Sequence, residues 1–148
     1  MVNTMFIPDG FELYELFPKN FYLEHYRPAN IPKMWNVFDY RLKYTMDRLR
    51  KRYGPLVAND WYWGGVNQYR GWRPTDCIVG ADFSQHKYGR AIDLKTTKKT
   101  DGTVFTIRDD INHEDFKYIT CVEMNITWLH IDVRDYNKEK FGILKVYP

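Results

Sequence analysis

The sequence predicts an α+β fold in which helices flank a small antiparallel sheet, and three observations support this prediction. The chain has 148 residues, enough for one domain with a substantial core. One long segment repeats apolar residues at helical spacing, whereas several short apolar segments lie between turn residues. Aromatic residues make up 18% of the chain and the hydrophobic set 44%, which argues against a disordered chain. We therefore expect one domain over residues 1–148.

The N-terminal part of the chain is expected to be an irregular arm followed by a long helix. Over residues 1–33, prolines recur and would interrupt regular structure: Pro8, Pro18, Pro28 and Pro32. From residue 34 to residue 53, apolar residues recur three and four positions apart, as on one face of an amphipathic helix: Met34, Phe38, Leu42, Met46, Leu49 and Tyr53. Gly54 and Pro55 follow directly and are expected to end this helix.

The middle of the chain is expected to form strands around a long loop. Residues 56–59 and 91–95 are short apolar segments bounded by turn residues, which is typical of strands. Residues 66–79 have no such pattern and are expected to form a loop, and long loops in compact domains are often functional. Asp101-Gly102 is a turn signal, so we expect a hairpin that leads into residues 104–107.

The C-terminal part is expected to contain a second helix and a buried strand. Asp109 or Asp110 could cap this helix, which would bury Phe116, Ile119 and Val122. Residues 126–133 are typical of a buried strand. On a regular strand the residues would alternate between two faces, one with Trp128, His130 and Asp132 and the other with Leu129, Ile131 and Val133.

The composition argues against several classes of partner. The 22 basic and 19 acidic residues leave a formal charge of +3, which dispersed surface lysines explain without a nucleic acid partner. The densest basic run, residues 48–52, lies at the end of the predicted helix, where positive charge complements the helix dipole. No segment approaches the ~20 apolar residues that span a bilayer, and the first residues do not form a secretory signal. Cys77 and Cys121 are not closely spaced, so a reducing compartment is the simpler expectation.

Three residues are candidates to hold one metal ion. His86 and Asp93 lie seven residues apart, and His130 lies in the predicted strand 126–133. Two imidazoles and one carboxylate satisfy three corners of a zinc tetrahedron and leave the fourth for water, as in catalytic sites. A bend at Gly89 would let His86 and Asp93 converge. The alternative is a histidine paired with a carboxylate for purely structural reasons.

Two motifs carry a resemblance to a known family: Ser84-x-His86-x-x-Gly89-x-Ala91-x-Asp93 and Trp128-x-His130-x-Asp132. Together they resemble the M15 zinc peptidases, which include D-Ala-D-Ala carboxypeptidases and dipeptidases, phage endolysin L-Ala-D-Glu peptidases and the zinc fold of Hedgehog domains. The likeness covers residues 34–133 and is to the small phage-encoded type. It implies a Hedgehog-like fold with one Zn²⁺ bound by His86, Asp93 and His130.

The resemblance also implies residues that would bind the substrate. The family places an arginine in a loop upstream of the first motif, where its guanidinium can bind a carboxylate or carbonyl oxygen. Arg73 matches this position, and Arg70 is an equally good candidate. Ser84 would lie beside the metal and form a hydrogen bond with the substrate or with a ligand.

The general base is the point at which the chain departs from many members of the family. These members have a glutamate three residues before the last histidine, where this chain has Thr127. In other members the acid lies further upstream, and Glu123 fits that second pattern. On an unbroken strand Glu123 and His130 would face opposite sides, so a turn or bulge must intervene at residues 124–125. Asp132 is a competing acid, but at ~6.6 Å along the strand it is better suited to support His130 or to contact the substrate.

The resemblance implies a monomeric zinc metallopeptidase that cuts the stem peptide of peptidoglycan, with no nucleic acid or membrane partner. Such an enzyme would be made in the host cytoplasm and would act at the bacterial cell wall as a phage lysis enzyme, or as part of a phage particle. Thr127 leaves open a noncatalytic phage structural or cell-wall-binding protein that keeps the fold. A metal-free domain whose aromatic loop at residues 61–72 contacts glycans is a third interpretation.

Overall fold

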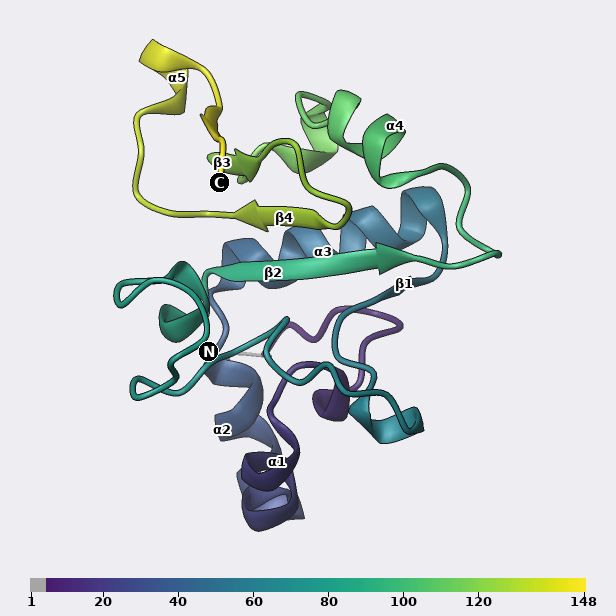
Figure 1. Cartoon of the computed structure of the whole chain (residues 1–148), viewed down its shortest axis with the longest axis vertical. Helices are drawn as coiled ribbons and strands as arrows, with labels where there is room; N and C mark the ends of the chain where they lie inside the picture. Colours follow the sequence, from purple (N-terminus) through teal and green to yellow (C-terminus); the bar gives the residue numbers. More distant parts are fainter. Residues whose placement is uncertain (1–4) are drawn as a thin grey trace.

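The computed structural model describes residues 5–148, and within them a sheet of five short strands carries the fold (Figure 1): β1 (Leu56–Val57), β2 (Ala91–Thr96), β3 (Cys121–Glu123), β4 (Leu129–Asp132) and β5 (Leu144–Val146). The strand order is β1-β2-β4-β3-β5. All neighbouring pairs are antiparallel except β3 and β5, which are parallel. The expected α+β architecture is confirmed, but the sheet is mixed, because β5 joins the edge beside β3 in the parallel direction.

The helices within residues 5–148 are short except for one: α1 (Lys19–His25), α2 (Ile31–Asn36), α3 (Tyr40–Tyr53), α4 (Val104–Asp109) and α5 (Lys138–Phe141). In the arm expected over residues 1–33, residues 1–4 lie outside the described part of the chain. The rest of the arm contains α1, two 3-10 turns and the start of α2, so it is a series of short helical pieces. None of the helices within residues 5–148 is long and apolar enough to cross a bilayer.

The long helix predicted over residues 34–53 is two helices, because the chain leaves the helical conformation at Asp39. The carboxylate of Asp39 accepts a hydrogen bond from the backbone N–H of Arg41, which caps the start of α3. The apolar spacing continues through this break since both helices pack on the same core. Gly54 ends α3 with a φ of +84°, as expected from the sequence.

Two other predicted elements are wrong. The segment expected as the second strand of a hairpin is α4, because Thr103 and Thr106 exchange hydrogen bonds in a capping box. The helix expected after Asp109 is only a 3-10 turn at Glu114–Phe116, and Val122 lies in β3 opposite Ile131. In both places capping or strand pairing decided the element against the expectation from apolar spacing.

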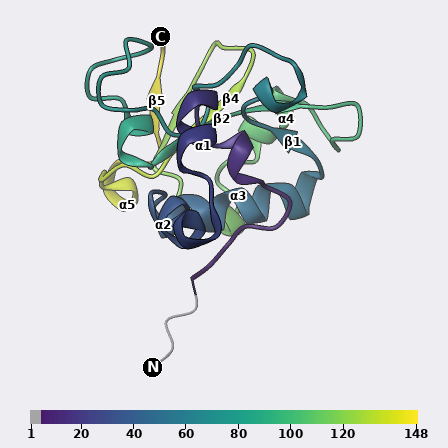
Figure 2. The same cartoon turned by 90° about the horizontal axis from the view of Figure 1, so that it is seen from below.

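The core lies between α3 and one face of the sheet. Figure 1 shows α3 running behind β2 and β4, and in the view of Figure 2 the same helix lies to one side of these strands. The buried side chains that join helix and sheet in one cluster are Leu42, Met46, Leu49, Ile92, Leu94, Leu129 and Ile131. These sheet residues alternate with polar residues that face the other way, so the opposite face of the sheet is free to carry a site.

Candidate metal centre

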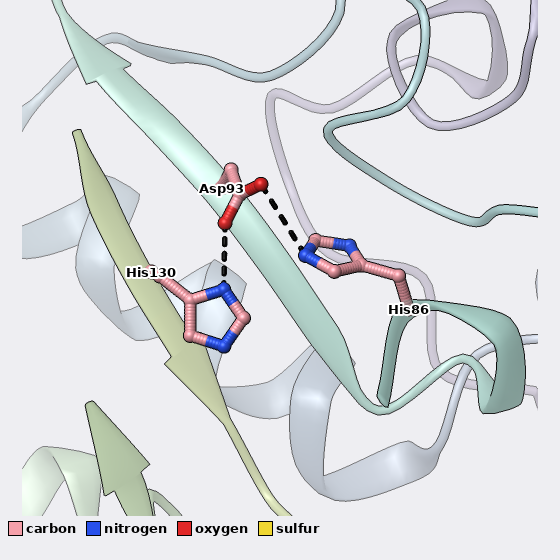
Figure 3. A group of neighbouring side chains, drawn as sticks. All are labelled: His86, Asp93 and His130. Carbon is pink, nitrogen blue, oxygen red and sulfur yellow. Dashed lines mark hydrogen bonds and ion pairs between the residues drawn. The ribbon is translucent and has the colours of Figure 1, made fainter. Parts of the chain in front are cut away.

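His86, Asp93 and His130 come together on the polar face of the sheet, with ligand atoms that all lie within 4.8 Å of one another (Figure 3). Nδ1 of His130 lies 2.7 Å from one carboxylate oxygen of Asp93, and Nε2 of His86 lies 3.3 Å from the other. All three side chains are buried. Zinc bonds of about 2.0–2.2 Å put tetrahedral ligand atoms about 3.3 Å apart, so these three residues could hold one metal ion with small shifts.

Strand pairing places two of the three candidate ligands. Asp93 of β2 is directly opposite His130 of β4 in the antiparallel ladder, and opposite residues project their side chains from the same face. The expected alternation of β4 is therefore observed, although the strand begins at Leu129 and is shorter than predicted.

His86 arrives from a different element, the 3-10 turn Gln85–Tyr88. Gly89 ends this turn with a φ of +67°, and a Cβ at this position would collide with the carbonyl oxygen of Val37. The carbonyl of Gly89 also accepts a hydrogen bond from the backbone N–H of Asp39, at the break between α2 and α3. The expected bend at Gly89 is thus present, and the helix break holds it against the core.

Each histidine is held through the ring nitrogen that faces away from Asp93. Nδ1–H of His86 donates to the carbonyl oxygen of Gly71 at 2.7 Å, so Nε2 is the ring nitrogen that faces Asp93. Nε2 of His130 lies 3.1 Å from the carboxylate of Asp132, so Nδ1 is the ring nitrogen that faces Asp93 and that would bind a metal ion after loss of its proton. Metal-binding histidines are usually oriented in this way by an oxygen acceptor behind them.

Hydrogen bonds between the three residues keep Asp93 ionised and favour a proton on His130. Burial opposes the ionised form of Asp93, but hydrogen bonds with His130 and His86 outweigh it and hold the pKa of this carboxyl well below its usual range. Burial also opposes protonation of His130, yet hydrogen bonds to Asp132 and Asp93 raise its pKa to about 9. A metal ion would therefore have to displace a proton from His130, and its binding would strengthen as pH rises.

Asp132 lies behind His130 and is bound by Arg134. Nε and Nη2 of Arg134 donate to the two oxygens of Asp132 at 2.7 and 2.6 Å, and the carboxylate is fully buried. Burial opposes its charge, but Arg134 and His130 hold the pKa of Asp132 well below its usual range. Its position suits the support of a metal ligand, which is one of the two roles expected for it.

The three candidate ligands open into a cavity of about 450 Å³. The residues that line it include all but Asp132 of the site residues expected from the sequence: Arg73, Ser84, His86, Asp93, Glu123 and His130. The other lining residues are Val79, Gly80, Ala81, Phe83, Gln85, Trp128, Arg134 and Val146. The sequence interpretation assigned no role to Arg134, although it continues the two-residue alternation of His130 and Asp132.

Glu123 lies next to His130, across the β3–β4 pair. Cys121 is opposite Asp132 and Val122 is opposite Ile131, so the next step of the ladder brings Glu123 level with His130. The expected reversal occurs between β3 and β4, where Asn125 has a φ of +60°. Asp93, His130 and Glu123 thus form a row across three adjacent strands on the polar face of the sheet.

Of the two candidate arginines, Arg73 reaches the metal centre. Its Nη2 lies 3.3 Å from Asp93, while Nε donates to the carbonyl of Tyr69 at 2.6 Å. Arg70 instead donates to the carbonyl of Ala58 at 3.1 Å and does not line the cavity. Ser84 lines the cavity, and its hydroxyl accepts the backbone N–H of His86 at 3.3 Å, capping the turn that carries this ligand.

The remaining histidines and the aromatic loop lie outside the cavity. His25 packs on Phe21, and His113 caps the turn Glu114–Phe116, as ordinary helix residues would. In the loop at residues 61–72, Trp72 packs against the core while Trp63 is exposed.

Comparisons with known proteins find no match for this chain among protein-family models, curated proteins or solved structures. The resemblance to the M15 peptidases therefore depends on the two sequence motifs alone.

Proposed function

We propose that this chain is a zinc-dependent peptidase of the M15 type that hydrolyses a peptide bond in the stem peptide of peptidoglycan, as a phage lysis enzyme. The observation that carries the proposal is the row Asp93, His130 and Glu123, which puts two candidate ligands and an acid at one level of the sheet, beside His86 and facing one cavity. The peptidoglycan substrate and the phage role are supported by the motif resemblance alone.

The donor set fits a catalytic zinc ion. Two imidazole nitrogens and one carboxylate oxygen are ligands that zinc accepts, and His86, Asp93 and His130 would hold the ion with a fourth position left for water. When bound, zinc supplies a Lewis acid that polarises a carbonyl group and lowers the pKa of a water at the open position.

Glu123 is the residue that we assign as general base. Its place beside His130, facing the cavity, suits removal of a proton from the attacking water and transfer of that proton to the leaving amine. Arg73 contacts the Asp93 oxygen that faces His86 and lines the cavity, where its remaining N–H donors could contact the carbonyl of the substrate.

The test measures the zinc content of the protein and its hydrolysis of purified peptidoglycan. Hydrolysis is detected by the release of new amines and by mass spectrometry of the fragments. We expect one zinc per chain and release of amines. Glu123→Gln should keep the zinc and lose about 10²- to 10⁴-fold in rate, since general base catalysis contributes that much. Glu114→Gln, an exposed glutamate outside the cavity, is the matched control and should retain the wild-type rate.

Three outcomes would contradict the proposal in different ways. A protein without stoichiometric zinc would show that His86, Asp93 and His130 do not form a zinc site. Bound zinc without hydrolysis would favour a noncatalytic protein, either a phage structural protein or a cell-wall-binding protein. Full activity of Glu123→Gln would move the general base to another residue.

A further inference from the structure

We propose that Arg134 binds a carboxylate of the substrate, so that the bond that is cut lies close to a free carboxylate group in the peptide. This inference rests on the proposed peptidase function for the identity of the substrate, whereas the anion site itself rests on the geometry of Arg134.

Two arginines line the cavity, and they differ in how many of their donors the protein uses. Arg73 is bound through all three guanidinium nitrogens, with Nε on Tyr69, Nη1 on Val79 and Nη2 on Asp93. Its side chain is 11% exposed. Arg73 is thus largely committed to holding the loop and Asp93, which limits what it can offer to a substrate.

Arg134 lines the same cavity and uses fewer of its guanidinium nitrogens in hydrogen bonds within the protein. Its Nε and Nη2 donate to Asp132, while its Nη1 makes no hydrogen bond with any residue from 5 to 148. The side chain is 31% exposed and lines the cavity. The bidentate contact with Asp132 fixes the plane of the guanidinium, so little side-chain freedom would be lost when an anion binds to Nη1.

The position of Arg134 sets the distance of that anion from the reaction. One oxygen of Asp132 lies 3.1 Å from Nε2 of His130 and 2.6 Å from Nη2 of Arg134, so a single carboxylate separates Arg134 from a candidate metal ligand. A substrate carboxylate on Nη1 would therefore lie within about one or two residues of the scissile bond. With a divalent cation in place, the charged side chains of the cavity together with Asp132 leave a net positive charge, which also favours an anionic peptide.

The carboxylate could come from two places in a peptide, and the experiment separates them. One is the C-terminal carboxylate of the substrate. The other is a free carboxylate within the chain, as on a glutamate joined through its side chain. The probes are the stem peptide L-Ala-γ-D-Glu-L-Lys-D-Ala-D-Ala, its C-terminal amide, and its form with isoglutamine in place of the γ-linked glutamate.

Binding of these probes is measured by calorimetry on zinc-loaded Glu123→Gln protein, which should bind the peptide without cutting it. One of the two amides should bind about 10- to 100-fold more weakly than the parent peptide, as expected for loss of a charge-assisted hydrogen bond. Adding Arg134→Gln should weaken the parent peptide by the same factor and abolish the difference. Arg134→Lys, which keeps the charge without the planar fork, should recover only part of the affinity.

Arg41 provides a matched control for these substitutions. It binds Asp39 through Nε and Nη2 in the same arrangement, two residues apart in the chain, but lies outside the cavity. Arg41→Gln should leave the binding of all three peptides unchanged. Zinc content and thermal unfolding of each variant show whether Arg134→Gln keeps the folded, metal-bound state, and Arg134→Lys serves if it does not.

If no stem peptide binds, that result counts against the proposed substrate and not against the anion site. The anion site of Arg134 is then tested with small molecules. Acetate and acetamide are titrated into the zinc-loaded protein while the Nε–H signal of Arg134 is followed by NMR. A shift with acetate alone, together with weaker acetate binding in Arg134→Gln, supports the anion site. Equal binding of acids and amides, or equal acetate affinity with and without Arg134, would overturn it.

Discussion

The two faces of the sheet are equally buried but depend on different physical interactions. On the face toward α3, the side chains of β2 and β4 are apolar: Ile92, Leu94, Leu129 and Ile131. On the opposite face, the same strands present Asp93, His130 and Asp132, all buried as well. Burial alone therefore does not distinguish the candidate metal centre from the core. The difference is that each buried charged side chain at the centre contacts a polar or oppositely charged partner.

This difference predicts different responses to substitution. An apolar side chain stabilises the fold through the area it removes from water and through close packing, so its loss costs free energy of unfolding in proportion to the cavity left. A charged side chain on the polar face belongs to a network, so its loss leaves another buried charge without a partner. Substitutions on the two faces should thus be separable by measuring stability and metal binding together.

The largest effect is expected for Asp93→Ala on the polar face. This carboxylate contacts both histidines and Arg73, so its removal takes away one ligand and leaves the others unpaired. We expect zinc affinity to fall by more than about 100-fold, since even loss of a residue that only supports a ligand costs 10- to 100-fold. Competition with a chelator measures this change. Asp101→Ala, an exposed aspartate in the turn after β2, should bind zinc normally.

Ile131→Ala tests the apolar face one residue from His130. It should lower the free energy of unfolding by about 2–5 kcal/mol, with Ile131→Val costing about 0.5–1.5 kcal/mol. Urea denaturation followed by circular dichroism gives these values. The folded fraction should still bind one zinc per chain. Loss of zinc from folded Ile131→Ala protein would show that the two faces do not act independently.

Glu15 offers a buried carboxyl without the cationic partners of the metal centre. Burial raises the pKa of Glu15 to about 7, and a hydrogen bond from the backbone N–H of Glu12 opposes this only in part. Between about pH 4.5 and pH 7 the unfolded chain releases this proton while the folded protein keeps it, so stability falls as pH rises through this range.

Glu15→Gln should remove that loss, because the amide cannot ionise and still accepts the hydrogen bond from Glu12. Above about pH 7 the variant should be more stable than the wild type by up to roughly 3 kcal/mol, and at pH 4 the two should be similar. Thermal unfolding at several pH values measures the difference, with the exposed Glu24→Gln as control. Parallel pH profiles for wild type and Glu15→Gln would show that Glu15 does not titrate in this range.

Local patterns predicted the parts of the fold where one signal was strong. Residues 40–53 form a helix that Gly54 ends, and β2 and β4 lie within one or a few residues of their predicted positions. Patterns failed where capping or strand pairing decided the element against the apolar spacing. Residues 104–109 became α4 through the Thr103 cap, and residues 121–123 became a strand because β4 was available to pair with them.

The sequence by itself determined the chemistry of the candidate ligands and the two-sided character of β4. Residue type and two-residue alternation are local properties of a strand, and the spacing of His86, Gly89 and Asp93 is a local property of a turn. The roles of these residues in a reaction stay predictions.

Only the tertiary structure decided which other groups surround the ligands. Glu123 meets His130 because β3 and β4 pair in one register. The side chain of Arg73, rather than that of Arg70, reaches the carboxylate of Asp93 because of the path of its loop. Such placements depend on contacts between residues distant in the chain, and the free energy of those contacts is not encoded in any short segment.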